Sequence, residues 1–219
     1  MIVNTRAIVL NHVRYGESSL VVHLYTEQLG RQAVFVKGAF GKKSQLKASL
    51  FQPLYLIETS IHHWDKRQMQ RISNIRVLQP FHDILMHPIK SSIALFIAEA
   101  LTKTIREEDA NKELFAFLSH SLQTLNLMKK GTANFHLIFL IHLTRYLGFY
   151  PNLQEFSADM PDFVTHLMTL SFEHIETLEI SHSQRNQMMD YILSYYALHV
   201  DNFGKMKSFM VLQQVFKPV

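Results

Sequence analysis

RQAVFVKGAFGKKSQLK, residues 31–47, joins a strand to a basic loop. In its first part Val34 and Val36 fall on one face and Phe35 on the other, which is the period of a half-buried strand. From Lys37 onward it holds four lysines and no acid, and two glycines let the backbone turn. We therefore expect a loop that attracts polyanions, because each lysine that neutralises a phosphate releases counterions.

Strand-like alternation recurs on both sides of this stretch. Residues 2–15 and 20–25 precede it, and residues 54–58 and 70–77 follow it. Five short strands joined by glycine turns within about 80 residues are typical of a small antiparallel barrel or sandwich. Among small barrels, the five-stranded OB type is the one that carries nucleic acid on its sheet face.

The apolar period changes from two to 3.6 after Pro80. Apolar stripes predict helices over 89–105, 114–125, 134–147, 183–199 and 205–216, with an irregular patch at 152–180. Within that patch, residues 171–180 fit a short hairpin or the edge of a helix. The sequence thus predicts an α+β chain, with a five-stranded antiparallel OB-type barrel domain over 1–80 and a mostly α-helical domain over 81–219.

The positive charge belongs to the first part of the chain. Residues 1–80 hold eleven Lys and Arg against four Asp and Glu, a balance of +7, whereas residues 81–219 hold eleven against fourteen, a balance of −3. The two balances sum to the net charge of +4. Such an asymmetry indicates an electrostatic footprint on the barrel.

Composition excludes several classes of site. The chain has no cysteine, so disulfides and zinc–thiolate sites are ruled out. His82 and His87 are five apart and His136 and His142 six apart, whereas paired metal ligands on a helix need three or four. We therefore expect no metal and no cofactor. No apolar run reaches the ~18 residues of a membrane span, and no signal peptide is evident, so we expect a soluble cytoplasmic protein without a membrane partner.

Nucleotide chemistry fits the basic loop poorly. A P-loop needs Gly, four residues, Gly, Lys and then Ser or Thr, but Lys43 follows Gly41-Lys42 and Val36 occupies the first glycine position. The sequence also has no nucleophile elbow and no dinucleotide fingerprint. We expect no enzyme, although a nucleotide hydrolase remains a rival. A solvated basic turn without a partner also remains open.

Cations and aromatic residues of the barrel are the candidate nucleic-acid contacts. Aromatic rings stack on bases without reading sequence, and Tyr15, Phe35, Phe40 and Trp64 are the candidates. Core packing is the alternative for each ring, but Phe40 lies in a Gly-x-x-Gly-Lys turn, where burial is difficult. The predicted DNA-binding residues are Arg14, Arg31, Lys37, Phe40, Lys42, Lys43, Lys47, Lys66, Arg67 and Arg71.

Several short motifs, in order, carry a family resemblance. YGES (15–18), Thr26 with Leu29-Gly30, VKGA (36–39) and LFQP (50–53) resemble the N-terminal domain of the bacterial recombination mediator RecO. LGFYP (147–151) and KMKS (205–208) resemble stretches of that family's helical domain. The resemblance implies an OB barrel, a helical bundle, and a nucleoid-associated protein that binds and anneals single- and double-stranded DNA. It also implies cooperation with RecR and single-strand-binding protein in loading RecA.

One departure and one further hypothesis concern the helical domain. Many family members carry a cysteine zinc knuckle after the Leu-Gly-x-x-Pro segment, but residues 152–163 offer no cysteine, so this region must hold together by packing. We expect Arg145, Lys205 and Lys207 to receive the acidic C-terminal tail of single-strand-binding protein. The alternative function is a non-enzymatic adaptor whose basic barrel binds an acidic protein.

Overall fold

The computed structural model describes residues 1–41, 46–106, 109–151 and 162–216. The chain forms two compact units, residues 1–82 with 101–122 and residues 83–100 with 123–219. The division between them falls inside helices α2 (Pro88–Thr104) and α3 (Lys112–Leu127).

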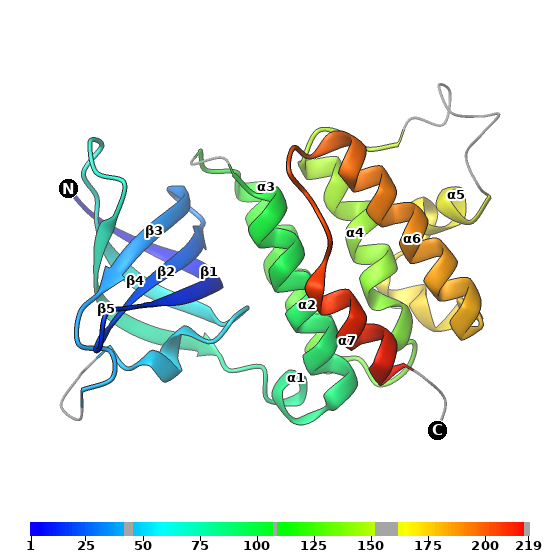
Figure 1. Cartoon of the computed structure of the whole chain (residues 1–219), viewed down its shortest axis with the longest axis horizontal. Coiled ribbons are helices and arrows are strands. Elements are labelled where there is room, and N and C mark those ends of the chain that lie inside the picture. Colours follow the sequence, from blue (N-terminus) through cyan, green and yellow to red (C-terminus); the bar gives the residue numbers. More distant parts are fainter. Residues whose placement is uncertain (42–45, 107–108, 152–161, 217–219) are drawn as a thin grey trace. The chain divides into compact units, whose positions relative to one another are not determined.

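Five strands form a closed barrel in the first unit (Figure 1). The strands are β1 (Ile2–Tyr15), β2 (Ser19–Thr26), β3 (Gly30–Val36), β4 (Leu56–His62) and β5 (Gln70–Gln79). Around the barrel they follow the order β1-β2-β3-β5-β4, and all neighbours are antiparallel except β3 and β5. This topology confirms the predicted OB-type barrel.

Alternating apolar side chains fill the barrel. Leu20 and Val22 of β2 and Val34 and Val36 of β3 are fully buried in one cluster, as the alternation predicts. Phe51 joins them from the 3-10 helix η1 (Ala48–Phe51). The outward residues between these positions are therefore free to form a surface site.

Strand β4 begins later and ends later than the predicted 54–58. Leu54 has a left-handed φ of 65°, and the amide of Tyr55 donates to the carbonyl of Gln52 at 3.1 Å. These residues form the turn that precedes the strand, and the strand itself continues to His62.

Two helix ends cover part of the barrel's outer wall within the first unit. Tyr25 is buried, its ring stacks 6.4 Å from that of Phe115, and its hydroxyl donates to the carbonyl of Asn111 at 3.3 Å. The side-chain amide Nδ2 of Asn11 donates to Thr102 Oγ1 at 3.0 Å. The outer wall of β1–β3 is thus covered at one end and open at the other.

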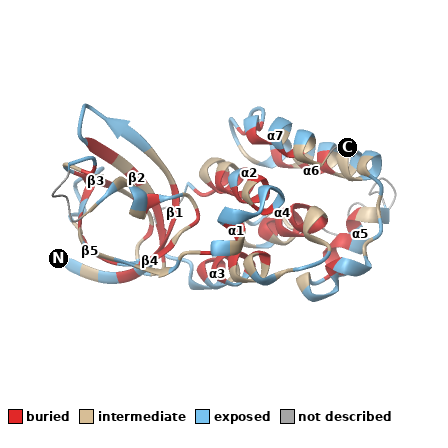
Figure 2. Cartoon of the chain, turned by 90° about the horizontal axis from the view of Figure 1, so that it is seen from below, coloured by how far each residue is buried: buried red, intermediate tan, exposed pale blue. Residues whose placement is uncertain are grey.

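The second unit is helical. Its elements are α1 (His82–Met86), the first part of α2, the end of α3, η2 (Thr132–Asn134), α4 (Phe135–Tyr146), α5 (Asp162–Thr169), η3 (Phe172–Thr177), α6 (His182–His199) and α7 (Lys207–Val215). Nine of the twelve residues of α4 are buried, so this helix is the centre of the unit (Figure 2).

All five predicted helices are present, as α2, α3, α4, α6 and α7, and the predicted mostly helical second part is confirmed. The described residues also contain α1 and α5, which the apolar periodicity did not predict. Segment 171–180 holds η3, so its helical alternative is correct and the hairpin is not. Across the described ranges, no helix combines the length and the apolar character that crossing a membrane requires.

Candidate nucleic-acid interface

A row of outward side chains crosses the open part of the barrel wall. Strand register aligns Val13 of β1 with Val21 of β2, Val21 with Phe35 of β3, and Phe35 with Arg71 of β5. The row therefore places an apolar aromatic ring beside an exposed cation on neighbouring strands.

Aromatic rings at the end of β1 extend this row. Tyr15 is 60% exposed, and its ring meets Phe35 edge to face with centroids 5.7 Å apart. Next to it, Arg14 lies over the ring of Phe40 at 5.0 Å from the centroid. Such a cation–π contact at an exposed site is worth about 0.5 to 1 kcal/mol, so Arg14 and Phe40 help to order each other.

Phe40 is held at the surface by its own turn. Gly38 adopts a φ of 70°, and its carbonyl accepts from the amide of Gly41 at 2.9 Å. Arg14 is fixed in turn, since its guanidinium donates to the carbonyl of Glu17 at 2.9 Å. Phe40 is 49% exposed, which agrees with the expectation that a ring in this turn is difficult to bury.

The loop between β4 and β5 continues the surface. Register pairs Arg71 with His62, whose ring stacks on Trp64 at 6.0 Å and 21°. The guanidinium of Arg67 lies over the Trp64 ring, 4.6 Å from its centroid. Trp64 remains 36% exposed.

A buried glutamine fixes this loop. Gln70 Oε1 accepts from the amide of Trp64 at 2.9 Å, and Nε2 donates to the carbonyls of Trp64 and Arg67 at 3.2 and 2.8 Å. These hydrogen bonds therefore hold the loop that carries Trp64 and Arg67 in one arrangement before a ligand binds. Sequence reasoning missed Gln70 and His62. His62 could have been found, because the i, i+2 spacing of His62 and Trp64 at a strand end puts both rings on the same face.

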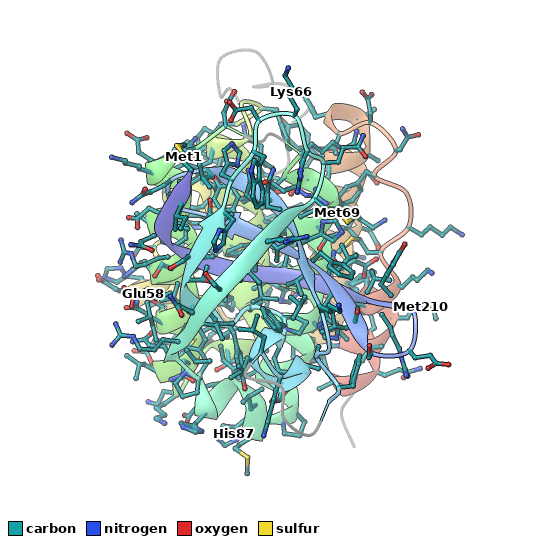
Figure 3. All side chains as sticks on the ribbon, turned by 90° about the vertical axis from the view of Figure 1, so that its left-hand side faces the viewer. Met1, Glu58, Lys66, Met69, His87 and Met210 are labelled. Atoms are coloured by element: carbon teal, nitrogen blue, oxygen red, sulfur yellow. The ribbon has the colours of Figure 1, made fainter. Side chains whose placement is uncertain are left out.

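We call these connected groups the aromatic–cationic surface: Arg14, Tyr15, Phe35, Lys37, Phe40, His62, Trp64, Arg67 and Arg71. Lys37 is included because it is exposed and directly follows β3. Lys47 and Lys66 are also exposed, and Lys66 stands clear of the barrel at the tip of the β4–β5 loop (Figure 3). Lys42 and Lys43 lie outside the described residues.

The side chain of Arg31 contacts helix α2 and does not belong to this surface. Its guanidinium donates to the carbonyl of Thr102 at 3.1 Å and to that of Ile105, at the C-terminal end of α2. Burial, together with the charge of Arg106, lowers the pKa of Arg31. The structure thus separates Arg31 from the aromatic–cationic surface.

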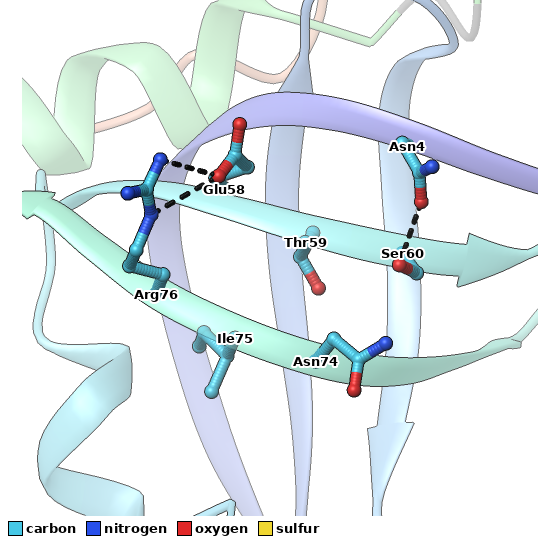
Figure 4. Close-up of a pocket in the computed structure, with 7 residues that line it drawn as sticks. All are labelled: Asn4, Glu58, Thr59, Ser60, Asn74, Ile75 and Arg76. Atoms are coloured by element: carbon cyan, nitrogen blue, oxygen red, sulfur yellow. Dashed lines mark hydrogen bonds and ion pairs between the residues drawn. The ribbon is translucent and has the colours of Figure 1, made fainter.

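Another part of the barrel wall, formed by Asn4 of β1, residues 58–60 of β4 and residues 74–76 of β5, carries paired charges instead. Arg76 donates to Glu58 at 2.7 Å, and Ser60 donates to Asn4 at 2.7 Å, in a shallow pocket that contains no free cation among its described residues (Figure 4). Arg6 is likewise bonded to a carboxylate, and its hydrogen bonds lower the pKa of Glu27. Arg6 and Arg76 are therefore paired with carboxylates, in contrast to Arg14 and Arg67, which lie over aromatic rings.

In the second unit the three predicted tail-binding cations are all exposed. Arg145 lies over the ring of Tyr150 at 4.6 Å from the centroid. Lys207 is the first residue of α7, and Lys205 lies two residues before it. No group of three His, Asp or Glu side chains with metal-binding geometry occurs in the part of the chain that the structure describes.

Comparison with known proteins gives a family match for each of the two parts of the chain. A family model described as "Recombination protein O N terminal" matches residues 1–81, and one described as "Recombination protein O C terminal" matches residues 87–162. The chain belongs to the RecO family. The "DNA repair protein RecO" of Bacteroides fragilis is 36% identical over 241 residues, covering 99% of this chain and 100% of that protein. That of Flavobacterium psychrophilum is 35% identical, with the same coverage.

Membership of this family of DNA repair proteins confirms the resemblance drawn from the short motifs. It also connects the chain with DNA repair and recombination. The N-terminal match covers the RecO-family barrel as a whole, and with it the aromatic–cationic surface.

Proposed function

We propose that this RecO-family protein is a non-enzymatic recombination mediator that binds and anneals DNA strands on its aromatic–cationic surface. The observation that supports this most directly is that rings and cations adjoin on the barrel wall. Arg14 lies over Phe40, Arg67 lies over Trp64, and strand register pairs Phe35 with Arg71. Basic grooves that track a backbone while rings stack on bases are how proteins bind single strands without reading sequence.

Annealing follows from the same charges. Two strands repel each other through their phosphates, and a surface that neutralises both lowers that repulsion. Arg67 and Arg71 lie on the loop and the strand at one end of the surface, whereas Arg14 and Lys37 lie at the other. We propose that this spread accommodates single-stranded and double-stranded DNA, with Lys42, Lys43 and Lys47 extending the footprint along the basic loop.

We further propose the partners and organisation that the family resemblance implies. The protein acts in the cytoplasm at the nucleoid, and with RecR it helps to load RecA on DNA coated with single-strand-binding protein. A barrel domain over 1–80 supplies DNA binding, and a helical domain over 81–219 supplies protein contacts. Arg145, whose guanidinium lies over the Tyr150 ring, and Lys205 and Lys207 at the start of α7 are the cations that we propose for an acidic peptide tail.

The DNA-binding proposal is tested by a pair of charge-matched double variants. Arg67→Gln with Arg71→Gln removes two cations of the surface, and the salt slope of single-strand binding should flatten by about 1.4, because each contact contributes roughly 0.7. Arg6→Gln with Arg76→Gln removes the same charge from residues that already bind carboxylates, so its slope should stay near that of the wild type. Fluorescence anisotropy against salt concentration measures both.

Equal slopes for the two double variants would contradict a local binding surface. Unchanged binding in both would favour the adaptor that binds an acidic protein. For the tail, pull-down of single-strand-binding protein should fall when its C-terminal tail is removed, and also when Arg145, Lys205 and Lys207 are changed to Ala. Undiminished capture in either case contradicts the tail-binding proposal.

A further inference from the structure

A groove of about 520 Å³ lies in the second unit, between the end of α3 and the 3-10 helix η3. Leu127 and Met128 line one wall, and Phe172 and Ile175 line the other. We call this feature the α3–η3 groove. Its volume falls within the roughly 300 to 1,000 Å³ of ligand-binding clefts. All of its lining residues belong to the same compact unit.

Tight packing fixes the two walls of the groove. Gly131, in the turn after α3, has a φ of 68°, and a Cβ there would lie 2.9 Å from Ile175 Cγ2 and 3.0 Å from the backbone of Glu176. The Phe172 ring stacks on that of Phe135 of α4, with centroids 4.7 Å apart. The groove is therefore formed before a partner binds, which lowers the entropic cost of binding.

Apolar side chains in the groove stay accessible to solvent. Leu127 is 72% exposed, and Met128 and Phe172 are half-buried. Accessible apolar groups with a polar rim are typical of surfaces that bind other proteins. A partner that places an apolar side chain here removes apolar surface from water on both sides of the contact.

Charged side chains of both signs border these apolar groups. Glu173 and Glu176 are exposed, and both project from the same side of η3, because residues i and i+3 eclipse in a 3-10 helix. Lys129 and Lys130 are exposed after the end of α3. Lys129 binds Asp83 at 2.9 Å, whereas Lys130 and the two glutamates have no ion-pair partner within the described ranges. The unpaired charge of the rim is therefore negative.

This combination of groups selects the class of partner. Two unpaired carboxylates repel the phosphates of a nucleic acid or of an anionic membrane. They disfavour an acidic peptide for the same reason, so the groove differs from the cations proposed above for an acidic tail. A polypeptide segment can carry apolar anchors next to cations, which matches both the walls and the rim.

We propose that the α3–η3 groove binds a segment of a partner protein that combines apolar side chains with Lys or Arg. The apolar side chains pack against Leu127, Met128 and Phe172, and the cations pair with Glu173 and Glu176. The inference does not rest on DNA binding. It gives the helical unit a protein contact that is opposite in charge to the one proposed for the acidic tail.

Three labelled peptides of equal length test the partner chemistry. They combine leucine with lysine, leucine with glutamate, and serine with lysine, and fluorescence anisotropy measures their binding to the full chain. The leucine–lysine peptide should bind about tenfold more tightly than the serine–lysine peptide, because apolar burial supplies most of the affinity. The leucine–glutamate peptide should show no dependence on the groove residues.

Surface variants assign the binding to the groove. Leu127→Ser should weaken binding of the leucine–lysine peptide about tenfold. Glu173→Gln with Glu176→Gln should weaken it about threefold, since exposed ion pairs contribute less than apolar burial. Neither variant removes a buried group, so both should keep the wild-type melting temperature.

Matched variants elsewhere serve as controls. Leu198→Ser, at an 82% exposed position of α6, and Glu17→Gln with Asp190→Asn, at exposed positions, should bind the leucine–lysine peptide as the wild type does. Equal affinity of Leu127→Ser and the wild type for this peptide, or no binding by the wild type, overturns the proposal. Binding of the leucine–glutamate peptide that is lost in Leu127→Ser would assign the groove to an acidic segment and overturn the basic one.

Discussion

Arg31 and Arg71 lie on adjacent strands of the same barrel, yet their surroundings differ. Arg31 donates to two carbonyls at the end of α2, whereas Arg71 is exposed beside Phe35. Position on a strand therefore does not fix the role of a cation, and its hydrogen-bond partners do.

Arg31→Ala should destabilise the fold and leave DNA binding nearly intact. Loss of hydrogen bonds from a charged group costs about 2 kcal/mol, and it also leaves two carbonyls at the end of α2 without their donor. Arg71→Ala should do the reverse, with unchanged stability and a flatter salt slope. Urea unfolding and salt-titrated anisotropy measure the two effects, and a flatter slope for Arg31→Ala would place this residue among the DNA contacts after all.

His136 is the second residue with a measurable signature. It is buried in α4 between the rings of Phe96 and Phe216, at 5.8 and 5.7 Å, and burial lowers its pKa to about 3. The folded state thus keeps a neutral imidazole at pH values where the unfolded chain, with a pKa near 6.5, binds a proton. Since the unfolded state binds more protons between these two values, stability falls as the pH falls through this window.

His136→Phe should weaken this pH dependence while keeping a ring in place. Between pH 7.5 and pH 5, the wild type should lose about 2 kcal/mol more of its unfolding free energy than the variant, because each pKa unit is worth 1.36 kcal/mol. Urea unfolding at both pH values measures the difference. His120→Phe, at an exposed position of α3, is the control and should behave as the wild type. Identical losses in the wild type and His136→Phe would show that the imidazole is protonated in the folded state.

The N-termini of α6 and α7 are capped in different ways. At α6 the cap is local: Ser181 accepts from the amide of Gln184 at 3.2 Å, and the Gln184 side chain accepts from the amide of Ser181 at 2.9 Å. At α7 the N-cap is Met206, which has no side-chain acceptor to offer. Glu99 of α2 replaces it, accepting from the amides of Lys207 and Ser208 at 2.9 and 2.7 Å.

Glu99→Ala should therefore destabilise the second unit by about 1 to 2 kcal/mol, the typical cost of a lost helix cap. Hydrogen exchange of the amides of residues 207 and 208 should accelerate at the same time, because they lose their acceptor. Glu179→Ala, an exposed acid outside the helices, is the control and should change neither quantity. Unaltered exchange in Glu99→Ala would mean that α7 does not depend on this carboxylate.

The difference between local and long-range contacts also explains which features of the fold and the site could be predicted from the sequence. Strand and helix positions follow from local periodicity, as with Val34 and Val36, and Phe40 was expected at the surface because of its glycine turn. The partners of Arg31 lie about 70 residues further along the chain, and no local pattern reports them. Gln70 likewise resembles an ordinary polar strand residue, although it organises the loop that carries Trp64. Roles that depend on long-range contacts were therefore beyond the sequence.

At the scale of the whole molecule, the barrel is completed by residues from beyond its five strands. Residues 101–122 belong to the same compact unit as residues 1–82. A fragment of residues 1–81 lacks Phe115 and the end of α2, so Tyr25 and Arg31 lose their partners. We expect this fragment to melt at a lower temperature than a fragment of residues 1–122, measured by circular dichroism.

A fragment of residues 1–100 controls for chain length. It adds 83–100, which belong to the other unit, but not 101–122, so it should melt near the temperature of the shorter fragment. If its melting temperature matched that of the 1–122 fragment, the contacts of Tyr25 and Arg31 would contribute nothing to the stability of the barrel.

The contact between Tyr25 and Phe115 also sets a delay during synthesis. The last strand ends at Gln79, yet the ring that covers Tyr25 is translated 36 residues later. At ~5 to 20 residues per second, the ribosome needs about 2 to 7 s to make this stretch. During that interval the Tyr25 ring lacks the ring that covers it, so we expect a chaperone that binds apolar segments to contact the nascent barrel there.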